Sequence, residues 1–239
     1  MPNEFALPEN TVWVCVKHLA RLSEELHRYD GAWLSREENL RLESMLSNSR
    51  RAQFLAGRYL VRNCLSAQLG GSWHTYHLSA PVGGSPRLLD AANGIVIQNI
   101  HVSISHSHDW VACAVAPQEV GIDVELSSRR RDFATIKQWM RDIDDSKVIN
   151  ERDESSAQRL FYEQWTLNEA WFKQLGVTQQ NNVTKPVAFR TCSETDRRAI
   201  VGRAKNLYVA VYSSLASTVR SSDRAFANFS WSSWCINNQ

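Results

Sequence analysis

The sequence predicts an α+β fold built from two similar α/β halves. A helix that ends in QLG at residues 68–70 is followed by strands, the last of them over 110–116. A second helix that ends in QLG at 174–176 is again followed by strands, the last over 207–213. Because both features recur after about one hundred residues, we expect two copies of one unit.

Hydrophobic periodicity predicts the elements of each half. The first half should contain a strand over 11–19, helices over 36–46 and 50–69, a Gly/Ser/Pro loop over 81–86, and strands over 100–105 and 110–116. The second half should contain a strand over 120–125, helices over 133–141 and 157–175, and strands over 186–214. We place the division between residues 120 and 121, which gives halves of 1–120 and 121–239.

Composition excludes several classes of protein. The 239 residues carry 27 basic and 25 acidic side chains, which argues against a nucleic-acid-binding protein. The N-terminus lacks the basic and apolar regions of a signal peptide, and no apolar stretch is long enough to span a membrane. The five cysteines are scattered without a CxxC pair, which indicates reduced thiols and a cytoplasmic protein.

Two carboxylates lie on one face of the strand VGIDVE, residues 120–125. Alternation puts Ile122 and Val124 on one side. Asp123 and Glu125 lie on the other, about 6.6 Å apart along the strand. Like charges so placed repel unless a cation lies between them, and oxygen ligands favour Mg²⁺ or Mn²⁺. The alternative is a solvated edge strand with a polar outer face.

The helix predicted over 157–175 carries a mixed stripe. Trp165, Glu169 and Lys173 follow at intervals of four residues, so they share one helical face. A surface ion pair between Glu169 and Lys173 is the structural alternative to a catalytic role.

A basic face characterises the helix over 50–69. Arg51, Arg58 and Arg62 share that face. Arg50 and Arg51 lie in the first turn, where positive charge opposes the helix dipole. A phosphate bound at the helix N-terminus would offset that cost. A solvated basic face is the alternative.

Four blocks, taken in this order, resemble the surfactin-synthetase-type 4′-phosphopantetheinyl transferases: RRAQFLAGRYLVR, GGSPRL followed by ISHS, VGIDVE, and the W-T-x-x-E-A-x-x-K pattern of WTLNEAWFK. The resemblance implies a pseudo-twofold monomer with coenzyme A in the cleft between its halves. It also implies the reaction. Mg²⁺ grips the coenzyme A pyrophosphate, a serine of an apo acyl or peptidyl carrier protein attacks the β-phosphorus, and 3′,5′-ADP leaves.

The same resemblance implies residue roles on the metal side. Asp123 and Glu125 match the metal-binding D-x-E, and Glu169 matches the third metal ligand. Glu169, or a water on the metal, would take the serine proton.

On the phosphate side, Lys173 matches a lysine that contacts the pyrophosphate. Ser105 and His106 match a serine–histidine pair that touches the coenzyme phosphates. We expect Arg51 and Arg58, on the basic helix, to bind phosphate as well.

The sequence departs from the family at two lysine positions. Asn168 stands where a lysine usually precedes the glutamate, and Ser85 replaces the lysine of a Gly-Lys-Pro motif. Arg87 is a candidate to replace one of these charges in coenzyme binding.

The carrier partner should be acidic and should dock on Arg129–Met140. This segment combines three arginines with an amphipathic helix bearing Trp139 and other apolar residues. The alternative is that these apolar residues pack into the core.

Two other functions use the same features. A metal-dependent phosphohydrolase or nuclease would employ Asp123, Glu125 and Glu169, but it would need neither the arginine helix nor ISHS. A catalytically silent relative that only binds carrier proteins is compatible with the replacement at Asn168.

Overall fold

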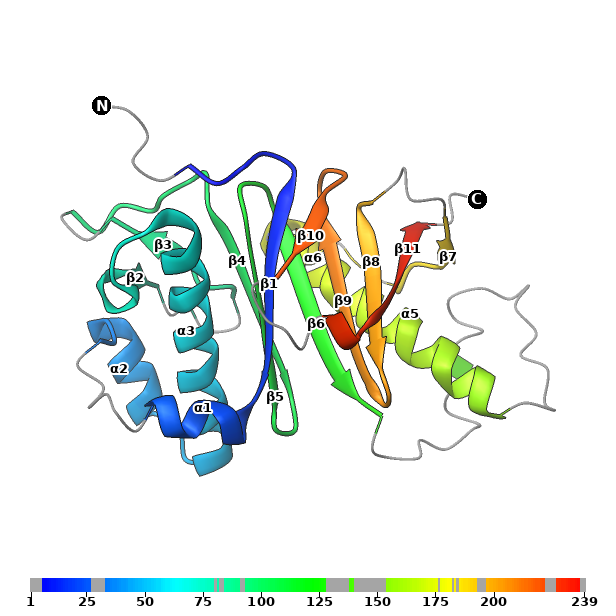
Figure 1. Cartoon of the computed structure of the whole chain (residues 1–239), viewed down its shortest axis with the longest axis horizontal. Coiled ribbons are helices and arrows are strands. Elements are labelled where there is room, and N and C mark those ends of the chain that lie inside the picture. Colours follow the sequence, from blue (N-terminus) through cyan, green and yellow to red (C-terminus); the bar gives the residue numbers. More distant parts are fainter. Residues whose placement is uncertain are drawn as a thin grey trace.

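The structure is a computed structural model of the whole chain (Figure 1). It describes residues 6–26, 33–79, 81, 84–90, 93–127, 138–139, 154–175, 177–181, 183, 185–192, 197–221 and 227–236. Within these ranges the strands form a four-stranded sheet, a five-stranded sheet and a two-stranded ribbon.

The first half is a sheet covered on one face by a long helix. Its strands run in the order β10-β1-β5-β4, with β1 antiparallel to β5 and β5 antiparallel to β4. The helix α3 packs against β1, β4 and β5. The sheet and helix elements are β1 (Thr11–His18), α3 (Asn48–Leu69), β4 (His101–Ser107), β5 (Trp110–Ala116) and β10 (Thr218–Arg220).

Smaller elements complete the first half around α3. They are α1 (Leu19–Leu26), α2 (Arg36–Glu43), the 3₁₀ turn η1 (Trp73–Thr75), β2 (His77–Leu78) and β3 (Leu88–Leu89). Ser35 and Glu38 form a reciprocal capping box at the start of α2. The apolar core of this half lies between α3 and the sheet and includes Val61, Leu65 and Cys113.

The second half repeats this plan. Its sheet runs in the order β6-β9-β8-β11-β7, with β6 antiparallel to β9 and β9 antiparallel to β8. The helix α5 packs against β6, β8 and β9. The elements are β6 (Val120–Leu126), α5 (Glu154–Gln174), α6 (Val177–Gln180), β7 (Phe189–Thr191), β8 (Ala199–Ala204), β9 (Leu207–Ser213) and β11 (Ser230–Ile236).

The two halves therefore share one order of elements. The series β1-α3-β4-β5 corresponds to β6-α5-β8-β9, and each places its last strand between the other two. This confirms the predicted α+β fold of two similar halves. The division at residue 120 stays a prediction, and β10, from the C-terminal part of the chain, pairs parallel with β1 in the first sheet.

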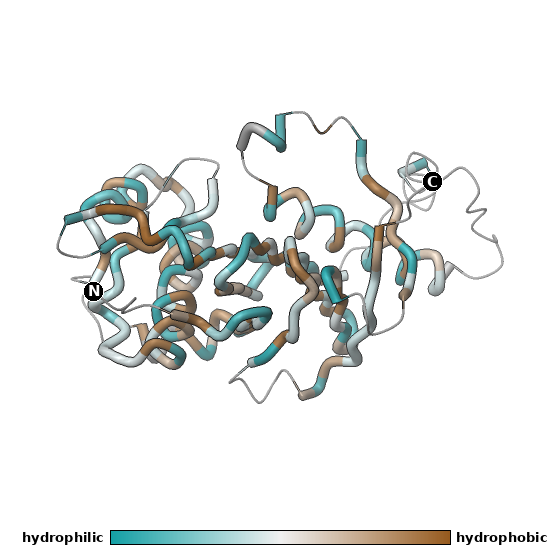
Figure 2. The backbone as a smooth tube through the Cα atoms, turned by 90° about the horizontal axis from the view of Figure 1, so that it is seen from above, coloured by the Kyte–Doolittle hydropathy of each residue, from teal (hydrophilic) through white to brown (hydrophobic). Residues whose placement is uncertain are grey.

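The two sheets pack face to face, with their helices on the outside (Figure 1). The shared core contains Val12, Val14 and Ala114 from the first sheet, and Ile122 and Val209 from the second. At one side of this core β4 lies beside β6. We call this junction, residues 103–107 beside 122–126, the seam. Figure 2 shows the molecule from above, with hydrophobic and hydrophilic segments alternating along both halves.

The predicted strands and long helices of the described ranges are present, with boundaries that differ by at most a few residues. Sequence periodicity did not predict α1, β2, β3, β10 or β11. No helix in the described part of the chain combines the length and hydropathy needed to cross a membrane.

Candidate active site

The two carboxylates of β6 project toward α5. Asp123 is only 4% exposed, and Ile122 and Val124 point the opposite way into the core between the sheets. The predicted alternation is therefore present. A solvated edge strand does not fit, because β4 covers this edge of β6.

Gly121 allows α5 to lie unusually close to β6. A Cβ at this position would overlap the carbonyl oxygen of Ala170 and would lie 2.7 Å from the backbone nitrogen of Gln174. Any side chain would push the helix away. Because Glu169 and Lys173 immediately precede these two helix residues, the close approach holds both of them over the strand.

Lys173 forms an ion pair with Asp123. Its Nζ lies 2.6 Å from Oδ1 of Asp123 and 3.0 Å from Oγ of Ser105. Ser105 Oγ in turn donates to the same Oδ1 at 2.8 Å. The other oxygen, Oδ2, is buried and has no hydrogen-bond partner within the described structure. Such an oxygen is costly to bury and is open to a further positive ligand.

Glu169 carries a carboxyl group with a perturbed pKa. Burial raises this pKa above its ordinary value, and the negative charges of Asp123 and Glu125 raise it further, while Lys173 acts in the opposite direction. The three carboxylates predicted to bind metal thus lie near enough to influence one another electrostatically.

This donor set fits a divalent cation, although the side chains do not yet surround one. Among the described residues, no three His, Cys, Asp or Glu side chains converge closely enough to hold a metal ion as they stand. Oδ2 of Asp123 nevertheless has no hydrogen-bond donor in the described structure. The pKa of Glu169 stays raised although Lys173 acts to lower it, so the negative charge of the carboxylates outweighs the positive charge of this lysine. Hard carboxylate oxygens suit Mg²⁺ or Mn²⁺.

Three serines of β4 connect the two halves along the seam. The Oγ atoms of Ser103, Ser105 and Ser107 accept hydrogen bonds from the backbone N–H groups of residues 122, 124 and 126, at 3.1, 3.3 and 3.3 Å. Ser107 also donates to Oε2 of Glu125 at 2.8 Å. The predicted phosphate ligand Ser105 therefore lies beside the carboxylates and contacts Asp123 directly.

His106 is exposed on the opposite face of β4 from these serines. Partial burial lowers the pKa of its imidazole, the positive charges of Lys173 and Arg50 lower it further, and Asp123 opposes them. Two cations therefore lie near enough to influence this histidine. Such a neighbourhood suits an anion.

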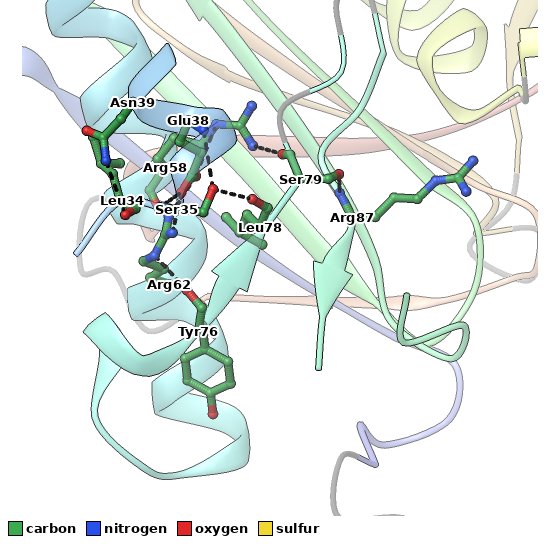
Figure 3. Close-up of polar contacts among 10 residues, drawn as sticks. All are labelled: Leu34, Ser35, Glu38, Asn39, Arg58, Arg62, Tyr76, Leu78, Ser79 and Arg87. Carbon is green, nitrogen blue, oxygen red and sulfur yellow. Dashed lines mark hydrogen bonds and ion pairs between the residues drawn. The ribbon is translucent and has the colours of Figure 1, made fainter. Parts of the chain in front are cut away.

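Arg58 and Arg62 point into the first half (Figure 3). Arg62 is fully buried and forms a bidentate ion pair with Glu38, at 2.6 and 3.0 Å. Arg58, 5% exposed, lies 3.6 Å from the same carboxylate and donates to the carbonyl of Ser79 at 2.9 Å. Burial lowers the pKa of Arg58 to about 10, with Glu38 opposing the shift. In this structure the Arg58 guanidinium therefore joins α3 to α2 and to Ser79, the residue after β2, while its predicted phosphate-binding role stays a prediction.

Arg51 and Arg87 differ in what holds them. Nη1 of Arg51 donates to the carbonyl of Leu42, which ties the start of α3 to α2. Arg87 is fixed through its backbone N–H, which donates to Oγ of Ser79 at 2.9 Å. Its side chain extends away from the Glu38 cluster (Figure 3).

Asn168 is committed to packing. Its amide donates to the carbonyl of Val187 at 3.0 Å and accepts from the Val187 N–H at 2.7 Å. One turn earlier, Gln164 forms the same pair of hydrogen bonds with Phe189. Position 168 thus faces the segment before β7, so a lysine there would not reach the carboxylates of β6 without breaking these bonds.

The expected carrier-docking segment Arg129–Met140 lies outside the described residues except for Gln138 and Trp139. Trp139 packs against Phe161 and Trp165 of α5, with ring centroids 5.1 and 5.4 Å apart. For this one side chain the packing alternative is therefore correct.

A cavity of about 790 Å³ opens at one end of the two sheets. Its described lining includes Lys17, Arg21, Trp110, Leu126 and Lys205, but none of the three carboxylates. One of its lining residues, Leu126, directly follows Glu125 in the sequence. The cavity therefore adjoins the candidate site without containing it.

Sequence reasoning missed Gly121, Ser103 and Ser107 as contributors to the site. The signals were present. HVSISHS places a serine at every second position of a strand, and glycine is rare inside a strand that must pair on a sheet. The meaning of both patterns depends on elements that are distant in sequence.

Comparison with known proteins shows which proteins this chain resembles. Residues 119–227 match the family model of the 4′-phosphopantetheinyl transferase superfamily. The 4′-phosphopantetheinyl transferase Sfp of Bacillus subtilis (strain 168) is 28% identical over 155 residues, which cover 60% of this chain and 66% of Sfp. The human L-aminoadipate-semialdehyde dehydrogenase-phosphopantetheinyl transferase is 28% identical over 138 residues, covering 52% of this chain and 42% of the relative.

A third relative, the 4′-phosphopantetheinyl transferase gsp of Aneurinibacillus migulanus, is 33% identical over 78 residues, or 33% of this chain and 32% of gsp. The chain thus matches less than two thirds of the length of these relatives. A crystal structure of a holo-(acyl-carrier-protein) synthase from Bacillus anthracis str. Ames in complex with CoA (3′,5′-ADP) aligns with a TM-score of 0.35 and 22% identity, over 44% of this chain and 91% of that one. The chain is therefore similar to the 4′-phosphopantetheinyl transferase superfamily, and the matched range contains the blocks VGIDVE and WTLNEAWFK.

Proposed function

We propose that this protein transfers the 4′-phosphopantetheine group from coenzyme A to a serine of an apo acyl or peptidyl carrier protein. The serine oxygen forms a bond to the β-phosphorus, the bond from that phosphorus to the bridging oxygen breaks, and 3′,5′-ADP leaves with the electron pair. The observation that carries the proposal is a buried oxygen, Oδ2 of Asp123, that has no hydrogen-bond partner in the described structure. The charge of the same carboxylate helps to raise the pKa of Glu169. Relatives named as phosphopantetheinyl transferases support it.

Asp123, Glu125 and Glu169 would hold Mg²⁺ or Mn²⁺. The cation, when bound, supplies positive charge to the pyrophosphate and offsets the charge that develops on the transferring phosphoryl group. The orphaned oxygen of Asp123 supports this assignment, since it is buried without a hydrogen-bond donor.

Glu169 is our candidate for the group that accepts the serine proton. In the protein without metal, burial and the charges of Asp123 and Glu125 raise the pKa of its carboxyl group. A water molecule in the same position could accept the proton instead, with Glu169 orienting it.

Lys173 and His106 are the candidate contacts of the coenzyme phosphates. The Lys173 side chain is 28% exposed, so its ammonium can touch Asp123 and a phosphate oxygen together. Arg50 is exposed and lies near enough to shift the pKa of His106. We add Arg50 to this group and retain Arg51 and Arg87 as further candidates.

The acidic carrier partner and its docking on Arg129–Met140 remain part of the proposal, together with a monomeric state and the halves 1–120 and 121–239. A cytoplasmic location suits the five cysteines, none of which forms a disulfide in the described structure.

The decisive experiment mixes the protein with coenzyme A, Mg²⁺ and several apo-carriers and measures carrier mass. A mass gain of one phosphopantetheine group that disappears with a chelator is the expected result. Asp123→Ala should lower the rate by about 100-fold or more, since it removes a charge-stabilising ligand. Breakdown of coenzyme A without a carrier would indicate a phosphohydrolase. Carrier binding without any mass change would indicate a silent relative. Either result would overturn the proposal.

A further inference from the structure

The seam joins two strands that belong to different sheets. The strands β4 and β6 lie side by side, yet each finds its backbone pairing elsewhere, β4 with β5 and β6 with β9. The edge N–H groups of β6 would remain buried and unsatisfied without another acceptor. The serine hydroxyls of β4 supply that acceptor at residues 122, 124 and 126.

A hydroxyl can accept and donate at the same time, and the serines of the seam differ in where the proton goes. Ser105 donates to Asp123 and Ser107 donates to Glu125, each at 2.8 Å. Ser103 is fully buried and contacts the backbone of β6, but its hydroxyl makes no hydrogen bond to a carboxylate in the described structure. Ser103 therefore bonds to backbone alone in the described structure, whereas Ser105 and Ser107 of the same strand also bond to carboxylates of the candidate site.

The Ser107 hydroxyl is directed at Glu125. Ser107 is 8% exposed, so water does not compete freely for its proton. Nδ1 of His108 is also within 3.3 Å of the same oxygen. Because the shorter bond runs to Glu125, that nitrogen would act as the donor to Ser107. The bond fixes Oε2 of a flexible glutamate, and it orients the remaining oxygen.

We propose that Ser107 is a positioning residue that orients Glu125 for a divalent cation. This inference rests on the proposed function, because it assumes that Glu125 is a metal ligand. Ser107 itself touches neither the metal nor the reacting atoms. Its effect is to limit the orientations of the carboxylate, so that less conformational freedom is lost when a cation binds.

The test compares Ser107→Ala with Ser103→Ala. Both substitutions remove one seam hydrogen bond to a backbone N–H, but only the first also removes a hydrogen bond to a carboxylate. Binding of Mn²⁺ to the protein is measured by electron paramagnetic resonance of the free ion, with coenzyme A present and absent. Thermal unfolding of each variant without metal reports the structural loss.

We expect Ser107→Ala to weaken Mn²⁺ binding by about 10-fold, and Ser103→Ala to bind as tightly as the wild type while it loses thermal stability. Ser107→Thr keeps the hydroxyl and should restore most of the affinity. In the transfer assay, Ser107→Ala should need a correspondingly higher Mg²⁺ concentration for half-maximal rate.

The outcomes separate this inference from the proposed function. Equal Mn²⁺ affinity in Ser107→Ala and Ser103→Ala would overturn the positioning role, whatever the transfer activity. Failure of Ser107→Thr to restore binding would also overturn it. If the wild type binds Mn²⁺ and shows the predicted difference but modifies no carrier, the positioning role holds and the proposed reaction fails. A wild type that binds no Mn²⁺ overturns both.

Discussion

At the scale of single residues, the candidate site holds more negative charge than its own lysine balances. Asp123 has Lys173 as an ion-pair partner at 2.6 Å. Burial, Asp123 and Glu125 nevertheless hold the pKa of Glu169 above its ordinary value. A buried carboxylate with one unpartnered oxygen gains most from a cation. The same charges that favour metal binding therefore destabilise the protein without metal.

Replacing Glu169 with glutamine should make stability less dependent on pH. The folded protein binds the Glu169 proton more tightly than the unfolded chain, because the folded pKa is raised. This contribution to stability is present below the ordinary pKa of 4.5 and is lost as the pH rises through the folded value. Over that window, without divalent ions, the wild type should lose more thermal stability than Glu169→Gln. Added Mg²⁺ should restore more of it in the wild type. Identical pH profiles would contradict the charge argument.

At the scale of elements, the position of α5 depends on Gly121. Gly121→Ala places a Cβ against backbone atoms of α5, which cannot yield locally. We expect a loss of about 1–3 kcal/mol in the free energy of unfolding, with lower transfer activity. Gly57→Ala is the matched control. Its Cβ meets a side-chain methyl of Ile104 at 2.8 Å instead of backbone, and alanine favours helix. Denaturant unfolding should rank Gly57→Ala as the more stable variant, and the reverse order would contradict this packing argument.

A second prediction at this scale concerns the missing lysine. Asn168→Lys should not tighten coenzyme A binding, because position 168 faces the backbone of Val187 rather than the carboxylates. It should lower the free energy of unfolding by about 1–3 kcal/mol, since buried backbone groups lose their partners. Asn168→Ala, which loses the same hydrogen bonds without adding charge, is the control. A lower KM for coenzyme A in Asn168→Lys alone would show that the lysine reaches the phosphates.

The elements also show which parts of the fold a sequence can predict. Periodicity located α3 and α5 because each buries a regular apolar face, and it located β1 and β5 because both faces of these strands are apolar and buried. It did not locate β11, whose sequence SWSSWCI lacks a continuous apolar face. Nor could it distinguish a solvated arginine from the buried Arg62, because the partner Glu38 lies 24 residues away. The D-x-E pair and the helix stripe were readable from local spacing, whereas the serine seam depends on tertiary structure.

At the scale of the whole molecule, departures from twofold symmetry explain why the described residues form the candidate site at one of two equivalent junctions. A twofold repeat would place β8 beside β1, as β4 lies beside β6. However, β11 occupies the free edge of β8 and β10 that of β1. The equivalent strand faces also differ. In β6 the face toward the helix carries Asp123 and Glu125, whereas in β1 it carries Trp13 and Cys15, which pack into the core with α3. The two halves thus share a framework and divide the chemistry.

Because the proposed coenzyme contacts and the proposed carrier-docking segment lie on different parts of the chain, we expect the two substrates to respond to different charges. Arg50, at the start of α3, lies near enough to shift the pKa of His106. Arg50→Glu should therefore raise the KM for coenzyme A and leave the carrier KM nearly unchanged. Arg130, which lies outside the described residues, belongs to the proposed carrier-docking segment, so Arg130→Glu should give the opposite pattern. Both effects should shrink as salt screens the charges. Separate titrations of each substrate at low and moderate salt measure this. If both variants shift the same KM, the two substrates are not bound by different charged surfaces, and the docking segment must be placed elsewhere.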